Sequence, residues 1–147
     1  MFSVLFLCAA CTTQSMLDDL LTEALPNGAE ARIFETCAPF MGGAVALLDE
    51  VLLPDEELHE PRDGEGKWTR SLSLSSFVEA DSAQYRVAGV AATLLDGKSC
   101  YRKISPKADE VLFGERSGRF YRSENREIII VIFDAPAGEG VMFVQAP

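Results

Sequence analysis

The chain has 147 residues, of which 23 are Asp or Glu and 13 are Lys or Arg, so its formal net charge at pH 7 is -10. This length fits a single domain with a proper hydrophobic core. An excess of carboxylates repels phosphate backbones and anionic lipid headgroups. The charge therefore argues against nucleic-acid binding, and any membrane attachment is expected to come from a lipid.

The chain opens with an uncharged and largely apolar segment. Within it Leu7, Cys8, Ala9, Ala10 and Cys11 resemble the export signal of bacterial lipoproteins, in which small residues precede the cysteine that receives the lipid. The match departs from the usual pattern at Cys8, and no Lys or Arg precedes the apolar run. The apolar run is also too short to span a bilayer as a helix, which takes roughly 20 residues.

This resemblance implies where in the cell the protein is located. Residues 1–10 are expected to form a signal-like segment, and Cys11 is the expected site of lipidation. Residues 11–147 would then form one globular domain on the periplasmic side of the cell envelope, held to the membrane through the lipid on Cys11.

A second interpretation treats residues 3–7 as the buried first strand of a cytosolic domain. A strand followed by Cys8, Gln14, Ser15 and a helix resembles the phosphate loop of low-molecular-weight tyrosine phosphatases and arsenate reductases. Gln14 stands where that family has an arginine, and Asp134 is followed by Ala135 where the family has Asp-Pro. The resemblance thus implies a degenerate phosphate loop over residues 8–15 that binds an anion without turnover.

Two cysteines, Cys37 and Cys100, lie beyond the first segment. In an exported protein they predict one disulfide, which closes a loop of about 60 residues and stabilises the fold by roughly 4 kcal/mol. In a cytosolic protein they would be two small buried apolar side chains. The only histidine, His59, lies in a hydrophilic run without partner ligands, so no metal or other cofactor is expected.

The first half of the chain has helical periodicity. Residues 16–25 predict a helix in which Ser15 and Asp18 occupy capping-box positions. A second helical pattern follows over residues 33–52, interrupted by Pro39, with Cys37 on its inward face.

The second half alternates with the period of strands. Residues 68–75 predict a strand with Leu72 and Leu74 facing inward, and residues 85–95 and 98–104 predict a hairpin around Asp96 and Gly97. A short helix is expected over residues 108–113, and strands over 119–122, 127–133 and 141–144, the second of these covered on both faces. The expected fold is α+β, with the amino-terminal helices packed on one face of a mostly antiparallel sheet of about five strands.

No catalytic constellation stands out, because no serine has the Gly-x-Ser-x-Gly context and a single histidine gives a triad little support. A non-catalytic binding or accessory role is therefore expected. Arg119, Arg122 and Arg126 stand out against the acidic background and are the predicted interaction patch for a protein partner.

Overall fold

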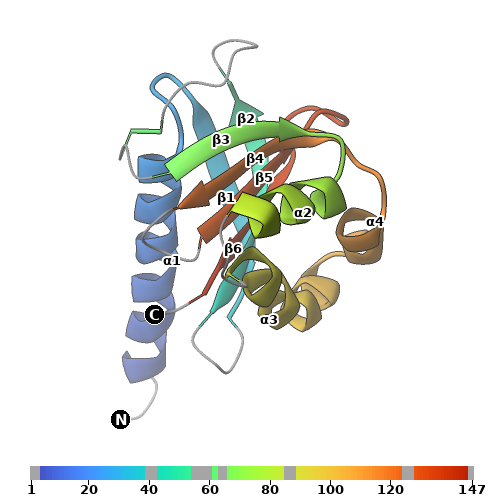
Figure 1. The fold of residues 1–147 in the computed structure, drawn as a ribbon. Helices are drawn as coiled ribbons and strands as arrows, with labels where there is room; N and C mark the ends of the chain where they lie inside the picture. Colours follow the sequence, from blue (N-terminus) through green and yellow to red (C-terminus); the bar gives the residue numbers. More distant parts are fainter. Residues whose placement is uncertain are drawn as a thin grey trace.

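The computed structural model describes residues 4–38, 43–53, 61–62, 66–84, 89–123 and 128–145, without the side chains of residues 4–13, 80–84 and 89–96. It is an α+β fold built on one six-stranded antiparallel sheet (Figure 1). In chain order the elements are α1 (Val4–Ala24), β1 (Glu30–Cys37), β2 (Ala44–Leu52), β3 (Gly66–Ser71), α2 (Leu74–Gln84), α3 (Gly89–Ile104), α4 (Ala108–Phe113), β4 (Gly118–Ser123), β5 (Ile128–Phe133) and β6 (Gly140–Val144).

The strands lie side by side in the order β1-β2-β6-β5-β4-β3. The last strand of the chain therefore sits in the middle of the sheet, between β2 and β5, and the edges are β1 and β3. Every residue of β5 is buried, which confirms the central strand expected from its unbroken apolar run. The short helix over residues 108–113 and the strands near residues 68, 119 and 141 are confirmed as well.

Helices cover both faces of the sheet, and on each face a separate hydrophobic cluster joins helix and strand residues. On one face α1 packs through Leu17, Leu21 and Ala24, each at most 2% exposed. On the other face α2, α3 and α4 pack against strand residues that include Phe120 and Phe143. The expectation that the amino-terminal helices cover one face is corrected: only α1 is amino-terminal, and the remaining helices lie opposite it (Figure 1).

Two stretches were predicted in the wrong state. Residues 33–52, expected to be helical, form most of the antiparallel pair β1 and β2. Their apolar residues satisfy a helical spacing only because β2 is buried on both faces and lacks alternation at its start. Conversely, Asp96 and Gly97 lie inside α3 rather than in a hairpin turn. Leu72 is 79% exposed and Leu74 begins α2, so neither is an inward residue of β3.

The amino-terminal alternatives are also resolved in part. Residues 4–7 are helical and belong to α1, so the strand expected over residues 3–7 is wrong. The phosphate loop expected over residues 8–15 is wrong for the same reason, since these residues continue the helix and every described strand pair is antiparallel. Ser15 does not cap the helix, because the helix begins eleven residues earlier, at Val4.

Candidate functional site

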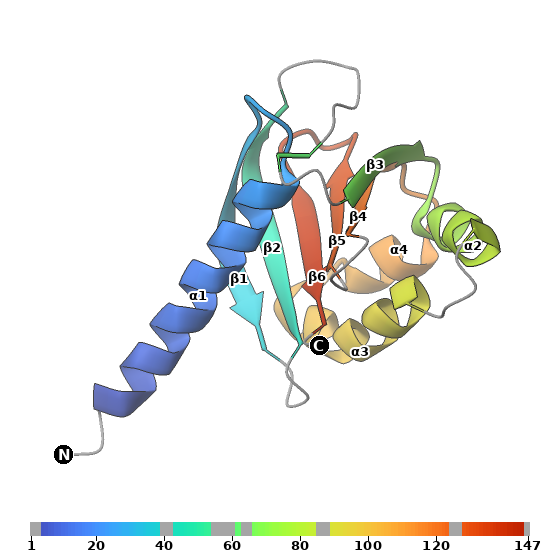
Figure 2. The same cartoon turned by 60° about the vertical axis from the view of Figure 1, so that its left-hand side comes forward.

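Cys11 lies within α1, thirteen residues before the helix ends at Ala24. At 1.5 Å per residue this distance is about 20 Å along the helix axis. The neighbouring strand β1 runs back along the helix for about 23 Å, at 3.3 Å per residue. Cys11 is therefore about level with the end of β1. The helix before it projects past the sheet, as Figure 2 shows.

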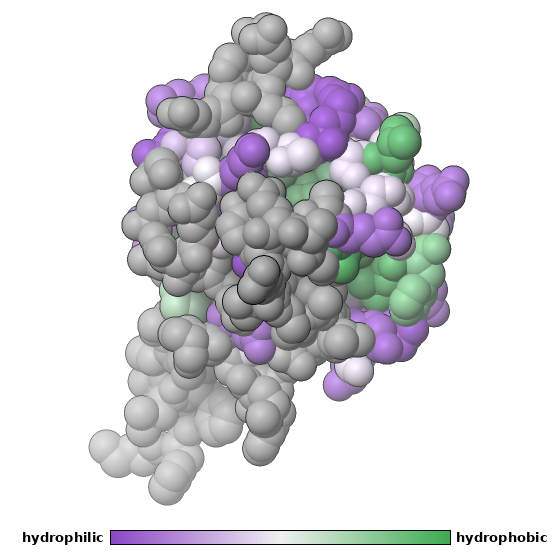
Figure 3. All heavy atoms as spheres, in the orientation of Figure 1, coloured by the Kyte–Doolittle hydropathy of each residue, from purple (hydrophilic) through white to green (hydrophobic). Residues whose placement is uncertain are grey.

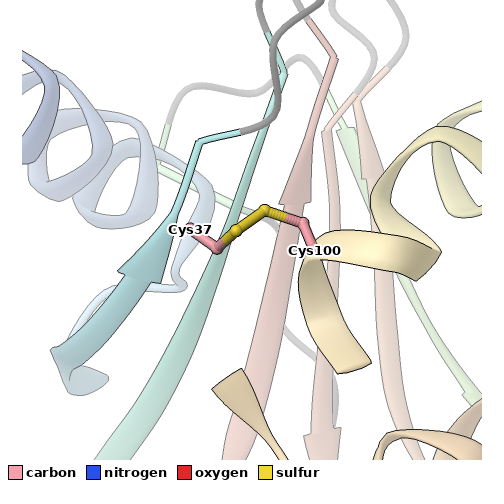
Figure 4. Close-up of a disulfide and its surroundings, with 2 residues drawn as sticks. All are labelled: Cys37 and Cys100. Atoms are coloured by element: carbon pink, nitrogen blue, oxygen red, sulfur yellow. A yellow bond between two sulfur atoms is a disulfide. The ribbon is translucent and has the colours of Figure 1, made fainter. Parts of the chain in front are cut away.

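Cys37 and Cys100 form a disulfide, with their Cα atoms 5.6 Å apart (Figure 4). Cys37 is the last residue of β1, and Cys100 lies on α3 with 3% exposure. The bond confirms the predicted pair, although both elements differ from those expected. It fastens the edge strand to the helix layer on one face of the sheet.

A β-bulge at Phe34 points Cys37 toward α3. In β1, Ile33 pairs with Leu48 and packs on the α1 face, whereas Cys37 pairs with Val45 and packs on the α3 face. Residues four apart in a regular strand would face the same way. The extra residue in the bulge reverses the alternation, so both the contact with α1 and the disulfide are made by one short strand.

Gly97 allows α3 to approach the sheet closely enough for this bond. A Cβ atom at position 97 would lie 2.7 Å from Cδ1 of Phe143 and 3.2 Å from Cγ2 of Val45. Beside it, the ring of Tyr101 meets Phe143 edge-on, with centroids 5.6 Å apart. The glycine that suggested a turn in the sequence is thus a contact point between a helix and two buried strands.

The predicted interaction patch is not gathered on one face of the sheet. Arg119 and Arg122 are three residues apart on β4, where neighbouring Phe120 and Tyr121 pack into opposite clusters. Because side chains alternate along a strand, that of Arg119 points to the α1 face of the sheet and that of Arg122 to the opposite face. Arg126 lies outside the described residues. A role for these arginines in binding stays a prediction.

A further arginine, Arg116, is largely enclosed, with a side-chain exposure of 13%. Its guanidinium lies 3.8 Å from the ring centroid of Phe133 and donates to the carbonyl oxygen of Ala135 at 3.0 and 3.1 Å. It also meets the carboxylate of Glu139 at 3.3 Å. These contacts brace the β5–β6 turn, which is a structural task that the sequence does not reveal.

Close to this arginine, burial raises the pKa of Tyr101 to about 12, and Arg116 opposes the rise. The phenol is therefore protonated at neutral pH and is no nucleophile or base there. Among the described residues no group of three His, Cys, Asp or Glu side chains is placed to hold a metal. His59 lies outside them.

Among the described side chains, five large apolar ones are exposed: Met16, Phe34, Leu52, Leu72 and Phe113. Leu72 is 79% exposed between β3 and α2, and Phe113 is 63% exposed at the end of α4. Figure 3 shows apolar areas on the side of the molecule that carries these helices, divided by hydrophilic surface. Arg102 lies over the ring of Phe113, 5.7 Å from its centroid. Single exposed apolar residues of this kind are common and define no site.

The described part of the chain contains no helix that is both long enough and apolar enough to cross a membrane. The arrangement thus offers an apolar helix end with a cysteine, a disulfide that secures an edge strand, and a braced turn. No family model, no curated protein and no solved structure matches the chain.

Proposed function

We propose that this chain is an exported bacterial protein, anchored at the periplasmic side of the membrane by a lipid on Cys11, with a non-catalytic binding or accessory role. The observation that carries the proposal is the position of Cys11 in α1. The sequence pattern of residues 7–11 calls for cleavage just before this cysteine, and Cys11 is about level with the end of β1.

Cleavage at this point would keep every described buried side chain in the product. It would remove residues 4–10 of α1, which extend about 10 Å beyond Cys11. Among the described side chains of α1, the first that is buried against the sheet is Leu17, six residues after Cys11. The cleaved product would therefore retain the contacts that the structure describes between α1 and the sheet.

The disulfide supports the same proposal from another direction. Disulfides persist in oxidising compartments such as the bacterial periplasm and are rare in the cytosol. The Cα atoms of Cys37 and Cys100 lie 5.6 Å apart, within the range that a disulfide spans.

Metabolic labelling with a palmitate analogue tests the anchor. The full chain, produced in a bacterial host, should incorporate the label and lose residues 1–10. Cys11→Ala should do neither, because it removes the acceptor thiol. Thr13→Ala is the control, since Thr13 lies just after residues 7–11, which carry the signal, and its replacement should leave both reactions intact.

Mass spectrometry of the purified protein determines whether the chain is cleaved before Cys11 and acylated. An acylated chain beginning at Cys11 supports the proposal. An unmodified chain that retains residues 1–10, or a label that survives Cys11→Ala, would refute it.

A further inference from the structure

The helix that carries Cys11 continues without a break into the packed core. α1 runs from Val4 to Ala24, and its first described fully buried side chain is Leu17. Six residues separate Cys11 from Leu17. They span about 9 Å if they stay helical and no more than about 21 Å if fully extended. The chain therefore has no long flexible linker between the lipidation site and the domain.

We propose that the acylated protein sits on the membrane in one orientation, with the end of the sheet that holds Cys37, Ala44 and Val144 facing the lipid headgroups. This inference rests on the proposed lipid anchor at Cys11. Beyond the anchor itself, the inference specifies which surface of the domain faces the bilayer and gives the physical reason.

The geometry of α1 selects this end of the sheet. A short turn joins α1 to β1, and the two pack side by side, so the amino end of α1 lies beside the carboxyl end of β1. Strand pairing brings Cys37 next to Val45, and Ala44 next to Val144, at the same end. Figures 1 and 2 agree, because both show the amino end of α1 and the carboxyl end of β6 toward the lower part of the molecule.

The helical connection limits how the domain can turn on the membrane. Residues 11–16 are part of α1, so the connection is a helical segment and not a flexible tether. Along the helix axis Cys11 lies about 20 Å from Ala24, where α1 ends at the far end of the sheet. With the helix intact, an anchor on Cys11 therefore holds the near end of the sheet closer to the bilayer than the far end.

The charges favour the same orientation on an anionic surface. Of the four carboxylates on the described strands, Glu30, Asp49 and Glu50 lie in the far half of the sheet. The described loop at the far end adds Asp134 and Glu139. The near half holds one carboxylate, Glu35, against two cations, Lys67 and Arg122, a balance of +1. The far half of the strands holds three cations, Arg32, Arg70 and Arg119, against its three carboxylates, a balance of zero before the loop carboxylates are added. The near end is therefore the more positive of the two, and an anionic surface attracts it more strongly.

Quenching of a fluorophore by nitroxide-labelled headgroups tests the orientation. A fluorescent amino acid is placed at Thr36, exposed near the proposed membrane end, or at Leu72, exposed at the opposite end. Each acylated protein is reconstituted into vesicles of phosphatidylcholine and phosphatidylglycerol. Quenching at Thr36 should be several-fold stronger than at Leu72.

A control variant carries about twenty Gly and Ser residues between Cys11 and Thr12, which span roughly 25 Å on average. With this linker the difference between the two positions should largely disappear. Equal quenching in an acylated protein without the linker overturns the orientation and leaves the anchor standing. A difference that survives the linker overturns the role of the short connection. A mass spectrum without an acyl group overturns both the anchor and the orientation.

Discussion

Replacing both Cys37 and Cys100 by alanine should destabilise the domain by about 4 kcal/mol at 25 °C, on the chain-entropy estimate for a loop of this size. The bond joins residues 63 positions apart, so it excludes many extended conformations from the unfolded chain. Alanine keeps the site apolar, and Cys100 is the more buried of the two. The predicted loss therefore comes chiefly from the unfolded state.

Thermal unfolding followed by circular dichroism measures the effect. An unfolding entropy of about 2.1 cal/mol/K per residue gives roughly 0.3 kcal/mol/K for the chain, so a loss of about 4 kcal/mol should lower Tm by about 13 °C. Each single variant, Cys37→Ala or Cys100→Ala, should lose almost as much as the double variant, because either one breaks the same bond. The wild-type protein treated with a thiol-free reducing agent should behave in the same way.

Two results would refute this reasoning. One is a double variant that loses no more than about 1 kcal/mol, the size of an ordinary substitution. The other is a pair of single variants whose effects add up to that of the double variant, because additivity would mean that the two sulfurs act independently. In either case the bond would not be the constraint that its loop length implies.

Three further predictions concern the α3 layer and the turn beside it. Gly97→Ala would stabilise an ordinary helix by about 1 kcal/mol. Here it should destabilise the domain by about 1 kcal/mol in urea unfolding, because the added Cβ meets the buried ring of Phe143. Ser99→Ala, at an exposed position of the same helix, is the control and should leave stability unchanged or raise it slightly. Arg116→Met should cost about 2 kcal/mol in the same assay, since it removes charged hydrogen bonds to the β5–β6 turn, and an effect within error would contradict that role. Burial raises the pKa of Tyr101 to about 12, so the stabilisation from the buried neutral phenol is complete below the unfolded pKa near 10 and is lost, by about 3 kcal/mol, as the pH rises through 12. Tyr101→Phe should abolish this part of the alkaline destabilisation, and tyrosinate absorbance follows the titration in the wild type. A stability profile that is unchanged in the variant would refute this role.

The parts of the fold that the sequence predicts are those where one physical signal dominates. The run of residues 128–133 has no polar residue, and a strand covered on both faces is the short element that fits it. Leu17 and Leu21 repeat with the helical period and lie against the sheet. In each case burial alone fixes the element.

The errors arise where two readings fit the same residues. Gly97 follows an aspartate and therefore has the signature of a hairpin turn, but tertiary packing uses it to bring α3 against Phe143. Phe34 breaks the alternation of β1 by a bulge, and a strand with broken alternation is easily taken for a helix. Register and bulges depend on the partner strand, which local sequence does not contain.

The candidate site divides in the same way. A cysteine pair can be inferred from count and compartment without the correct secondary structure, since the bond depends on proximity alone. To predict the arginine patch, one must know which face of the sheet each residue of β4 points to. In the structure Arg119 and Arg122 point to opposite faces. The enclosed position of Arg116 depends on the fold of a turn about twenty residues later in the chain.

The disulfide also connects stability with compartment. Small domains are stable by about 5 to 15 kcal/mol, so a bond that contributes about 4 kcal/mol is a large share of the total. It fastens an edge strand whose Cys37 is only partly buried, and β1 is held to the rest of the sheet through β2 alone. In a reducing cytosol the same chain would fold without that contribution. The export proposed for this chain would thus supply the oxidising conditions in which the bond that secures β1 can form.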